Sequence, residues 1–134
     1  MATADYGNPG GADDAITLVR EVYASFARRD LAGLTGLIDA GFALDAGGTA
    51  RLTGRTEPYI GASGLAEYFS DVAQVWEALD LHADDVRAVA GSVVVFGSVT
   101  GRTGGVDVRR RALWTFKLSH GRVASLRAAD LGPL

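Results

Sequence analysis

The second half of the chain alternates apolar and polar side chains in segments separated by glycine turns, and this pattern constrains the fold most. Within 106–118 one parity is mostly apolar and the other mostly charged or polar, as in a strand with one buried face. The apolar set is Val106, Val108, Ala112, Trp114, Phe116 and Leu118. Turn residues at Gly91-Ser92, Gly104-Gly105 and His120-Gly121 separate this strand from others predicted over 79–90, 93–102 and 122–130. The sequence therefore predicts an antiparallel meander.

The first half of the chain has helical periodicity. Apolar residues at helical spacing predict an amphipathic helix over 13–29, namely Ile16, Val19, Tyr23 and Phe26. Asp30 is the expected N-cap of a second helix that carries Leu31, Leu34, Leu37 and Ile38. Ser63 is the expected cap of a third helix that carries Leu65, Phe69, Val72 and Trp76. Between the last two helices, 42–45 and 51–53 are predicted to pair as short strands across Gly47 and Gly48.

Helices followed by hairpin-linked strands predict an α+β fold with a cone-like shape. In it, three N-terminal helices pack on one face of a strongly curved, mostly antiparallel sheet. Residues 1–12 are polar and rich in small residues, which predicts a flexible N-terminal tail. Residues 13–134 are predicted to form a single domain, a size at which one core suffices.

The composition excludes several classes of function. The chain has no cysteine and two histidines, so a thiolate site is excluded, and neither a metal nor an organic cofactor is expected. The net charge is −3 and the triplet Arg109–Arg111 alternates between strand faces, so no nucleic-acid partner is predicted. The longest apolar run is Val93–Phe96, too short for a membrane span, and the polar N-terminal segment is not expected to be a signal peptide. We expect a cytoplasmic protein.

Two charged residues share the inward parity of the last two strands. Asp130 follows Leu126 and Ala128 on the core-facing side, where desolvation would raise its pKa and allow proton exchange near neutral pH. Its other interpretation is a solvated residue at a strand end. Arg110 is expected either to neutralise an acidic ligand or pair with Asp130, or to be turned outward by a β-bulge.

Other candidate site residues lie along the chain. Asp45 is a candidate base at the mouth of a pocket, although an aspartate before Gly47 is also a common turn residue. His82 is a second candidate base, with a water-facing strand histidine as the alternative. Aromatic residues could stack on a flat ligand, although core packing requires the same spacing. The candidate ligand-binding residues are Tyr23, Phe26, Tyr59, Phe69, Arg110 and Trp114, whereas Trp76 is assigned to core packing.

Four stretches, in this order and spacing, resemble one known superfamily. They are Val22–Leu31, Tyr59–Phe69, Trp114–Phe116 and Gly121–Arg127. The chain resembles the SnoaL-like and ketosteroid isomerase-like branch of the nuclear transport factor 2-like superfamily, over nearly its whole length after the tail. The resemblance places Tyr23 and Trp114 beside positions that the family uses, so both are expected in the wall of an apolar pocket.

The known activities of this branch use different catalytic residues, which can be compared with this sequence. The catalytic positions of ketosteroid isomerase would fall at Val22, Ala46 and Ala112, where the required tyrosine and aspartates are missing. The epoxide hydrolases of the branch use an Arg-x-Asp strand motif, which neither Arg102 nor Arg109 begins. The similar polyketide cyclases use an acidic residue near the end of the last strand, and the nearest match is Asp130, with Asp45 as a further candidate.

The resemblance thus implies a pocket for a small apolar organic molecule, cyclic or of polyketide type. Whether the chain is an enzyme stays open: the first hypothesis is cofactor-independent acid/base isomerisation or cyclisation. The alternative is a non-catalytic ligand-binding or dimeric assembly module. In that alternative a homodimer would form through the outer sheet face around Leu113 and Thr115, as members of the family commonly pair.

Overall fold

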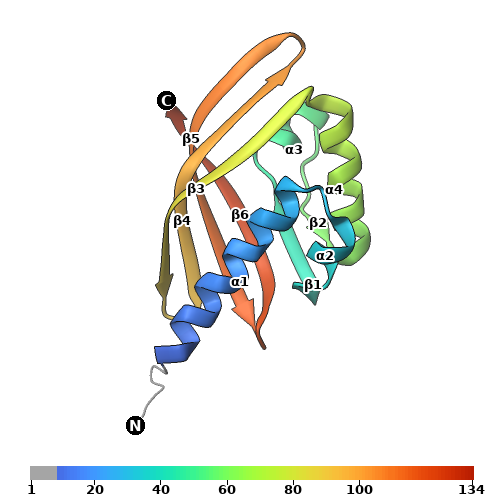
Figure 1. Ribbon diagram of the computed structural model, residues 1–134. Helices are drawn as coiled ribbons and strands as arrows, with labels where there is room; N and C mark the ends of the chain where they lie inside the picture. Colours follow the sequence, from blue (N-terminus) through green and yellow to red (C-terminus); the bar gives the residue numbers. More distant parts are fainter. Residues whose placement is uncertain (1–8) are drawn as a thin grey trace.

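The alternating half of the sequence forms four long strands in a computed structural model, which describes residues 9–134 (Figure 1). They are β3 (Ala78–Val89), β4 (Ser92–Thr103), β5 (Val106–Ser119) and β6 (Arg122–Pro133). Each pairs with the next in the antiparallel sense, which confirms the predicted meander. The first turn lies at Ala90 and Gly91, one residue earlier than predicted. Both residues have positive φ, as tight two-residue hairpin turns require.

The inner face of the long strands holds the core. Ala112, Trp114 and Phe116 of β5 are buried, as their parity predicts, and Val95 of β4 lies opposite Trp114. The prediction for Val106 is wrong, since this residue is 62% exposed. It stands at the tip of the β4–β5 hairpin, which extends past the helices (Figure 1).

Two further strands widen the sheet. β1 (Ile38–Asp45) lies parallel to β6 and pairs on its other edge with β2 (Tyr59–Ile60), in the order β2-β1-β6-β5-β4-β3. The strand predicted over 42–45 is confirmed but starts earlier. Ile38, predicted to lie in the second helix, begins β1 instead.

The strand predicted over 51–53 is wrong, because this segment lies in the short helix α3 (Gly48–Thr53). Both edges of β1 are already paired with other strands, so no edge is left for a hairpin across the two glycines. Gly47 has φ 57° before the helix and Gly54 has φ 74° after it, and the N–H of Gly54 closes the last turn. The glycines therefore bracket a helix.

The helices predicted before β1 are present with shifted ends. α1 (Pro9–Ala27) confirms the helix predicted over 13–29. It starts inside the predicted tail, so residues 9–12 are helical, and the rest of that tail lies outside the described residues. α2 (Leu31–Thr35) begins at the predicted cap, where the N–H of Gly33 donates to Oδ1 of Asp30 at 2.9 Å.

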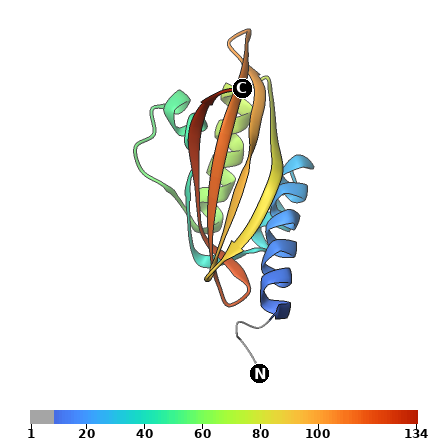
Figure 2. The same ribbon diagram turned by 90° about the vertical axis from the view of Figure 1, so that its left-hand side faces the viewer.

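α4 (Gly61–Val75) is the third predicted helix, but Ser63 lies inside its first turn and makes no cap. Together with α3, the described residues hold four helices. α1 and α4 lie over the same face of the sheet (Figure 1), and Figure 2 shows the other face of the long strands without a helix over it. The predicted α+β class, with helices on one face of a curved sheet, is confirmed.

Candidate functional site

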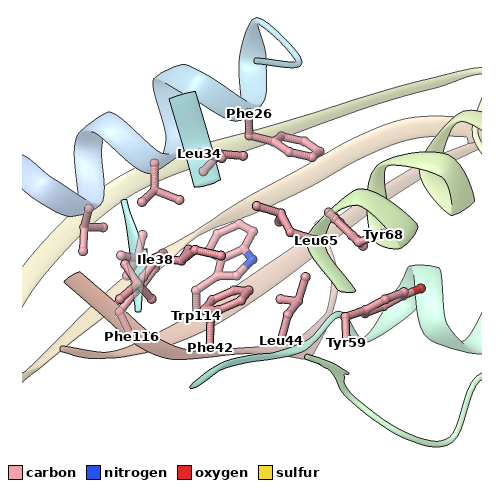
Figure 3. Packing of buried hydrophobic residues seen from close by; sticks show 14 of the residues in the cluster. Phe26, Leu34, Ile38, Phe42, Leu44, Tyr59, Leu65, Tyr68, Trp114 and Phe116 are labelled. Atoms are coloured by element: carbon pink, nitrogen blue, oxygen red, sulfur yellow. The ribbon is translucent and has the colours of Figure 1, made fainter. Parts of the chain in front are cut away.

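A cavity of about 460 Å³ lies between the helices and the inner face of the sheet. Its walls are mostly apolar and come from all four described helices and the sheet. Among them are Val22, Tyr23, Phe26, Leu34, Ile38, Phe42, Leu44, Leu65, Tyr68, Trp76, Leu79, Trp114, Phe116 and Leu126. Figure 3 shows Trp114 rising from the sheet among side chains of α2, α4 and β1. A concave, apolar site with few polar groups is the usual form of a small-molecule pocket.

Tyr23 and Trp114, both expected in the pocket wall, line the cavity side by side. Their rings meet edge to face, with centroids 5.4 Å apart and planes at 82°. Phe116, the next inward residue of β5, also contacts Tyr23, with ring centroids 5.8 Å apart. Edge-to-face contact is the favoured geometry for aromatic pairs and holds both rings in place. The deep wall of the cavity is therefore an ordered aromatic surface.

The hydroxyl of Tyr23 is the one buried side-chain polar atom without a hydrogen-bond partner in the described part of the chain. Burial raises the pKa of this phenol above its ordinary value, so it stays protonated and available as a donor. Nearly all buried polar groups in folded proteins find a partner, and an orphan group costs about 1–3 kcal/mol. The Tyr23 hydroxyl is therefore a donor without an acceptor among the described residues.

Three predicted aromatic residues have different positions. Phe26 lines the cavity, as predicted. Phe69 does not, because it packs behind Phe26 with centroids 5.8 Å apart. Tyr59 also lies outside the wall: its hydroxyl donates to Oδ2 of Asp71 at 2.7 Å and the Arg55 guanidinium lies 3.9 Å from its ring centroid. Neither residue is among those that line this cavity.

Two aromatic residues that could stack on a flat ligand, Trp76 and Tyr68, were not among the predicted ligand-binding residues but lie in the wall. Trp76, assigned to core packing, lines the cavity, and its Nε1 donates to Oγ1 of the buried Thr49 at 3.0 Å. Tyr68 lines it from α4, and burial raises the pKa of its phenol to about 12. Tyr68 stands three residues after Leu65 on the apolar face of the predicted helix, a spacing that fits both core packing and a pocket wall.

Glycines on the inner face of β4 make room for the two tryptophans. A Cβ on Gly101 would lie 3.0 Å from ring atoms of Trp76, and one on Gly97 would lie 3.2 Å from the Trp114 ring. The Cβ on Gly97 would also overlap the carbonyl oxygen of His82 in β3, next to the register shift between Ala83 and Asp85. The close approach of β3 to β4 and the position of the Trp114 ring thus both require a glycine at position 97.

At its mouth the cavity becomes polar. Nε of Arg110 lies 3.2 Å from Oδ1 and 3.0 Å from Oδ2 of Asp130, and both residues line the cavity. The N–H of Gly132 donates to Oδ1 of Asp130 at 2.7 Å, and Nη2 of Arg51 lies 3.7 Å from Oδ2. Of the alternatives for Arg110, pairing with Asp130 is the one observed.

The expectation that desolvation raises the pKa of Asp130 is wrong. The side chain is 29% exposed, and the hydrogen bonds from Arg110 and Gly132 lower its pKa below the ordinary value. The carboxylate is therefore ionised at neutral pH and is already paired. It can act as a weak base or an electrostatic partner, but it holds no proton to donate.

Asp45 does not line this cavity. The N–H of Gly47 is 3.4 Å from its Oδ1, and Nε of Arg127 is 3.7 Å from its Oδ2. The turn interpretation therefore describes its position. His82 is exposed on β3, where its Nε2 lies 2.9 Å from Oγ1 of Thr100, away from the cavity wall.

The three positions that the family resemblance marked, Val22, Ala46 and Ala112, all line the cavity. None of the three carries an ionisable group, as the sequence already indicated. Within residues 9–134 no group of three or more His, Cys, Asp or Glu side chains is arranged to hold a metal ion. No helix among the described residues is long and apolar enough to cross a membrane. The cytoplasmic location stays a prediction.

Comparison with known proteins gives a family and a fold. The model of the SnoaL-like domain family matches residues 19–126. No curated protein matches the sequence.

Three solved structures show the same fold at low sequence identity. A nuclear transport factor 2-like protein of unknown function from Burkholderia pseudomallei is 18% identical with a TM-score of 0.79, over 87% of this chain and 90% of that one. A putative SnoaL-like polyketide cyclase from Shewanella denitrificans is 14% identical with a TM-score of 0.69, over 85% of this chain and 88% of that one. An LEH-like epoxide hydrolase from M. tuberculosis is 12% identical with a TM-score of 0.68, over 90% of this chain and 84% of that one. These likenesses concern the fold alone.

Proposed function

The chain belongs to the SnoaL-like domain family, and we propose that it binds a small, largely apolar molecule, cyclic or of polyketide type, in its cavity. The lining of the cavity supports a ligand of this kind, because aromatic and aliphatic side chains surround it on every described element that borders it. A flat ring system would stack against the edge-to-face pair of Tyr23 and Trp114.

The observation that carries this proposal is the orphan hydroxyl of Tyr23, a residue that lines the cavity. A polar group left without a partner in an apolar site destabilises the free protein, and a ligand that accepts its hydrogen bond removes that cost. Such arrangements are characteristic of binding sites, where a few polar groups orient an otherwise apolar ligand. We therefore expect the ligand to carry a carbonyl, ether or hydroxyl oxygen toward the deep wall.

Binding is tested by fluorescence titration with Nile red, a neutral apolar probe. The phenyl ring of Ala46→Phe should occupy part of the cavity from its wall. The probe would then bury less apolar surface, and its affinity should fall by at least about tenfold. Ala88→Phe, at an exposed position of β3, is the matched control and should bind as the parent does. Equal affinity of the two variants would place the probe elsewhere and contradict the proposal.

A second candidate function is acid/base isomerisation or cyclisation, with Asp130 as the base. One observation favours it: Asp130 is the only carboxylate among the described residues that line the cavity. Against any substrate turned over, Asp130→Asn should abolish activity and leave the circular dichroism spectrum unchanged. Full activity in that variant would remove Asp130 from the mechanism and leave binding as the function.

We also propose that two copies pair through the outer sheet face. Phe96 is 43% exposed there and lies opposite Leu113, and Val94 lies opposite Thr115 in the next pair of this face. Light scattering after gel filtration should give the mass of a dimer for the parent and of a monomer for Phe96→Glu. A monomeric parent at working concentration would contradict the pairing.

A further inference from the structure

The mouth of the cavity has an excess of positive charge. The charged residues that line the cavity are Arg51, Arg110, Arg111 and Asp130. Arg111 has the outward parity of β5, so the side chains of Arg51 and Arg110 against Asp130 leave a net charge of +1 at the mouth. The chain as a whole has the opposite sign, with a net charge of −3. A local reversal of charge at the entrance of an apolar site favours ligands of the complementary sign.

The guanidinium groups at the mouth have donors to spare. Arg110 uses its Nε toward both carboxylate oxygens of Asp130, and neither of its Nη atoms has a hydrogen-bond partner within residues 9–134. The Arg51 side chain is 67% exposed and makes one long contact of 3.7 Å to the same carboxylate. Arg111 is exposed and has no ion pair within the described range. One carboxylate therefore contacts two guanidinium groups, those of Arg110 and Arg51.

We propose that the ligand of this cavity is an amphipathic carboxylic acid, with its apolar body inside and its carboxylate at the mouth beside Arg110 and Arg51. This inference rests on the proposed binding function and adds the chemical class of the ligand. The Arg110–Asp130 pair shows that the mouth already holds one carboxylate. A second carboxylate, on a ligand, would take up the free Nη donors, and bonds of this charge-assisted kind are roughly twice as strong as neutral ones.

Asp130 has a defined part in this arrangement. It competes with the ligand for Arg110 and Arg51, and it places a negative charge beside the incoming carboxylate. Removing its charge should therefore strengthen the binding of an acid. A purely structural ion pair predicts the reverse, because the loss of Asp130 would loosen the mouth and weaken all ligands alike.

The test is isothermal titration calorimetry at pH 7 and low salt with naphthaleneacetic acid and its amide, which have the same shape but differ in charge. We expect the parent to bind the acid at least about tenfold more tightly than the amide, the gain from about one charge-assisted hydrogen bond. Arg110→Gln should remove this preference by weakening the acid far more than the amide. Asp130→Asn should raise the acid affinity several-fold. Arg87→Gln, which removes a charge from an exposed ion pair on β3, is the control and should keep the preference.

The outcomes separate this inference from the proposal beneath it. Equal binding of acid and amide by the parent, or a preference that survives both Arg110→Gln and Arg51→Gln, would overturn the carboxylate site while leaving a cavity that binds apolar ligands. Arg51→Gln lies on the exposed side of α3 and serves as the second variant should Arg110→Gln fail to fold. Failure of Nile red and both naphthalene compounds to bind would overturn the proposed function and the inference together.

Discussion

At the deep end of the cavity Trp114 is 4% exposed and packs edge to face on Tyr23, whereas at the mouth the side chains of Arg110 and Asp130 are 42% and 29% exposed. The deep wall is held by apolar burial, at roughly 25 cal/mol per Å² of surface removed from water. The mouth is held by an ion pair in contact with solvent, a kind of contact that contributes about 0–1 kcal/mol. Stability and ligand selection are therefore assigned to different ends of one cavity.

The difference in exposure also explains which polar groups lack a hydrogen-bond partner in the protein. The deep end leaves one hydroxyl unsatisfied, that of Tyr23, because apolar neighbours surround it. The mouth leaves guanidinium donors free because water can satisfy them until a ligand arrives. A substitution at the deep end should therefore act first on folding, and a substitution at the mouth first on binding.

The largest loss of stability is expected for Gly97→Ala at the deep end of the cavity. The new Cβ would overlap the His82 carbonyl oxygen and press on the Trp114 ring, so β3 must move away from β4. We expect a loss of about 3 kcal/mol or more in the free energy of unfolding, measured by urea denaturation. Gly48→Ala is the control, since its Cβ has no neighbour nearer than 3.9 Å and its change should stay within about 1 kcal/mol. Equal midpoints for the two variants would show that the sheet does not depend on this glycine.

A smaller effect is expected on the free energy of unfolding at alkaline pH, through the buried phenol of Tyr68. Burial raises the pKa of Tyr68 to about 12, whereas an unfolded tyrosine titrates near pH 10. Above that pH the unfolded chain releases the proton first, so the stabilisation is complete below pH ~10 and is lost as the pH rises toward the folded value. Tyr68→Phe should lose about 1 kcal/mol less than the parent between pH ~8 and ~11. Parallel curves for the two proteins would mean that the phenol is in contact with water.

Much of the fold follows from patterns visible in the sequence. The parity of Ala112, Trp114 and Phe116 predicts the inner face of β5, and Asp30 predicts the start of α2 through its side-chain cap. These signals are local, because strand alternation and helix capping depend on residues a few positions apart. The segment α3 escaped prediction for a non-local reason: whether glycines flank a helix or join a hairpin depends on which edges of β1 are free.

The site was less predictable than the fold. Periodicity shows that Tyr59, Phe69 and Tyr68 are buried, but burial against other side chains and burial beside a cavity have the same sequence pattern. The contact of Arg110 with Asp130 depends on a register shift between Arg111 and Ala112, which places Asp130 opposite Ala112. A bulge of this kind leaves no sequence signal as strong as alternation, and it decides which charges meet at the mouth.

The smallest expected effect sharpens the comparison at the mouth. Asp130→Asn should change the free energy of unfolding by less than about 1 kcal/mol at pH 7, because its partner Arg110 stays in contact with water. Since the folded-state pKa of Asp130 is lowered, the contribution of its charge is present above the unfolded value near 4 and is lost as the pH falls through the folded value. The parent and the variant should therefore converge in urea denaturation as the pH falls through the lowered folded-state value. Asp107→Asn, at an exposed ion pair with Arg102 on the β4–β5 hairpin, gives the matched change away from the cavity. A loss of several kcal/mol specific to Asp130→Asn would make the mouth a structural element like the deep wall, and the division between stability and ligand selection would fail.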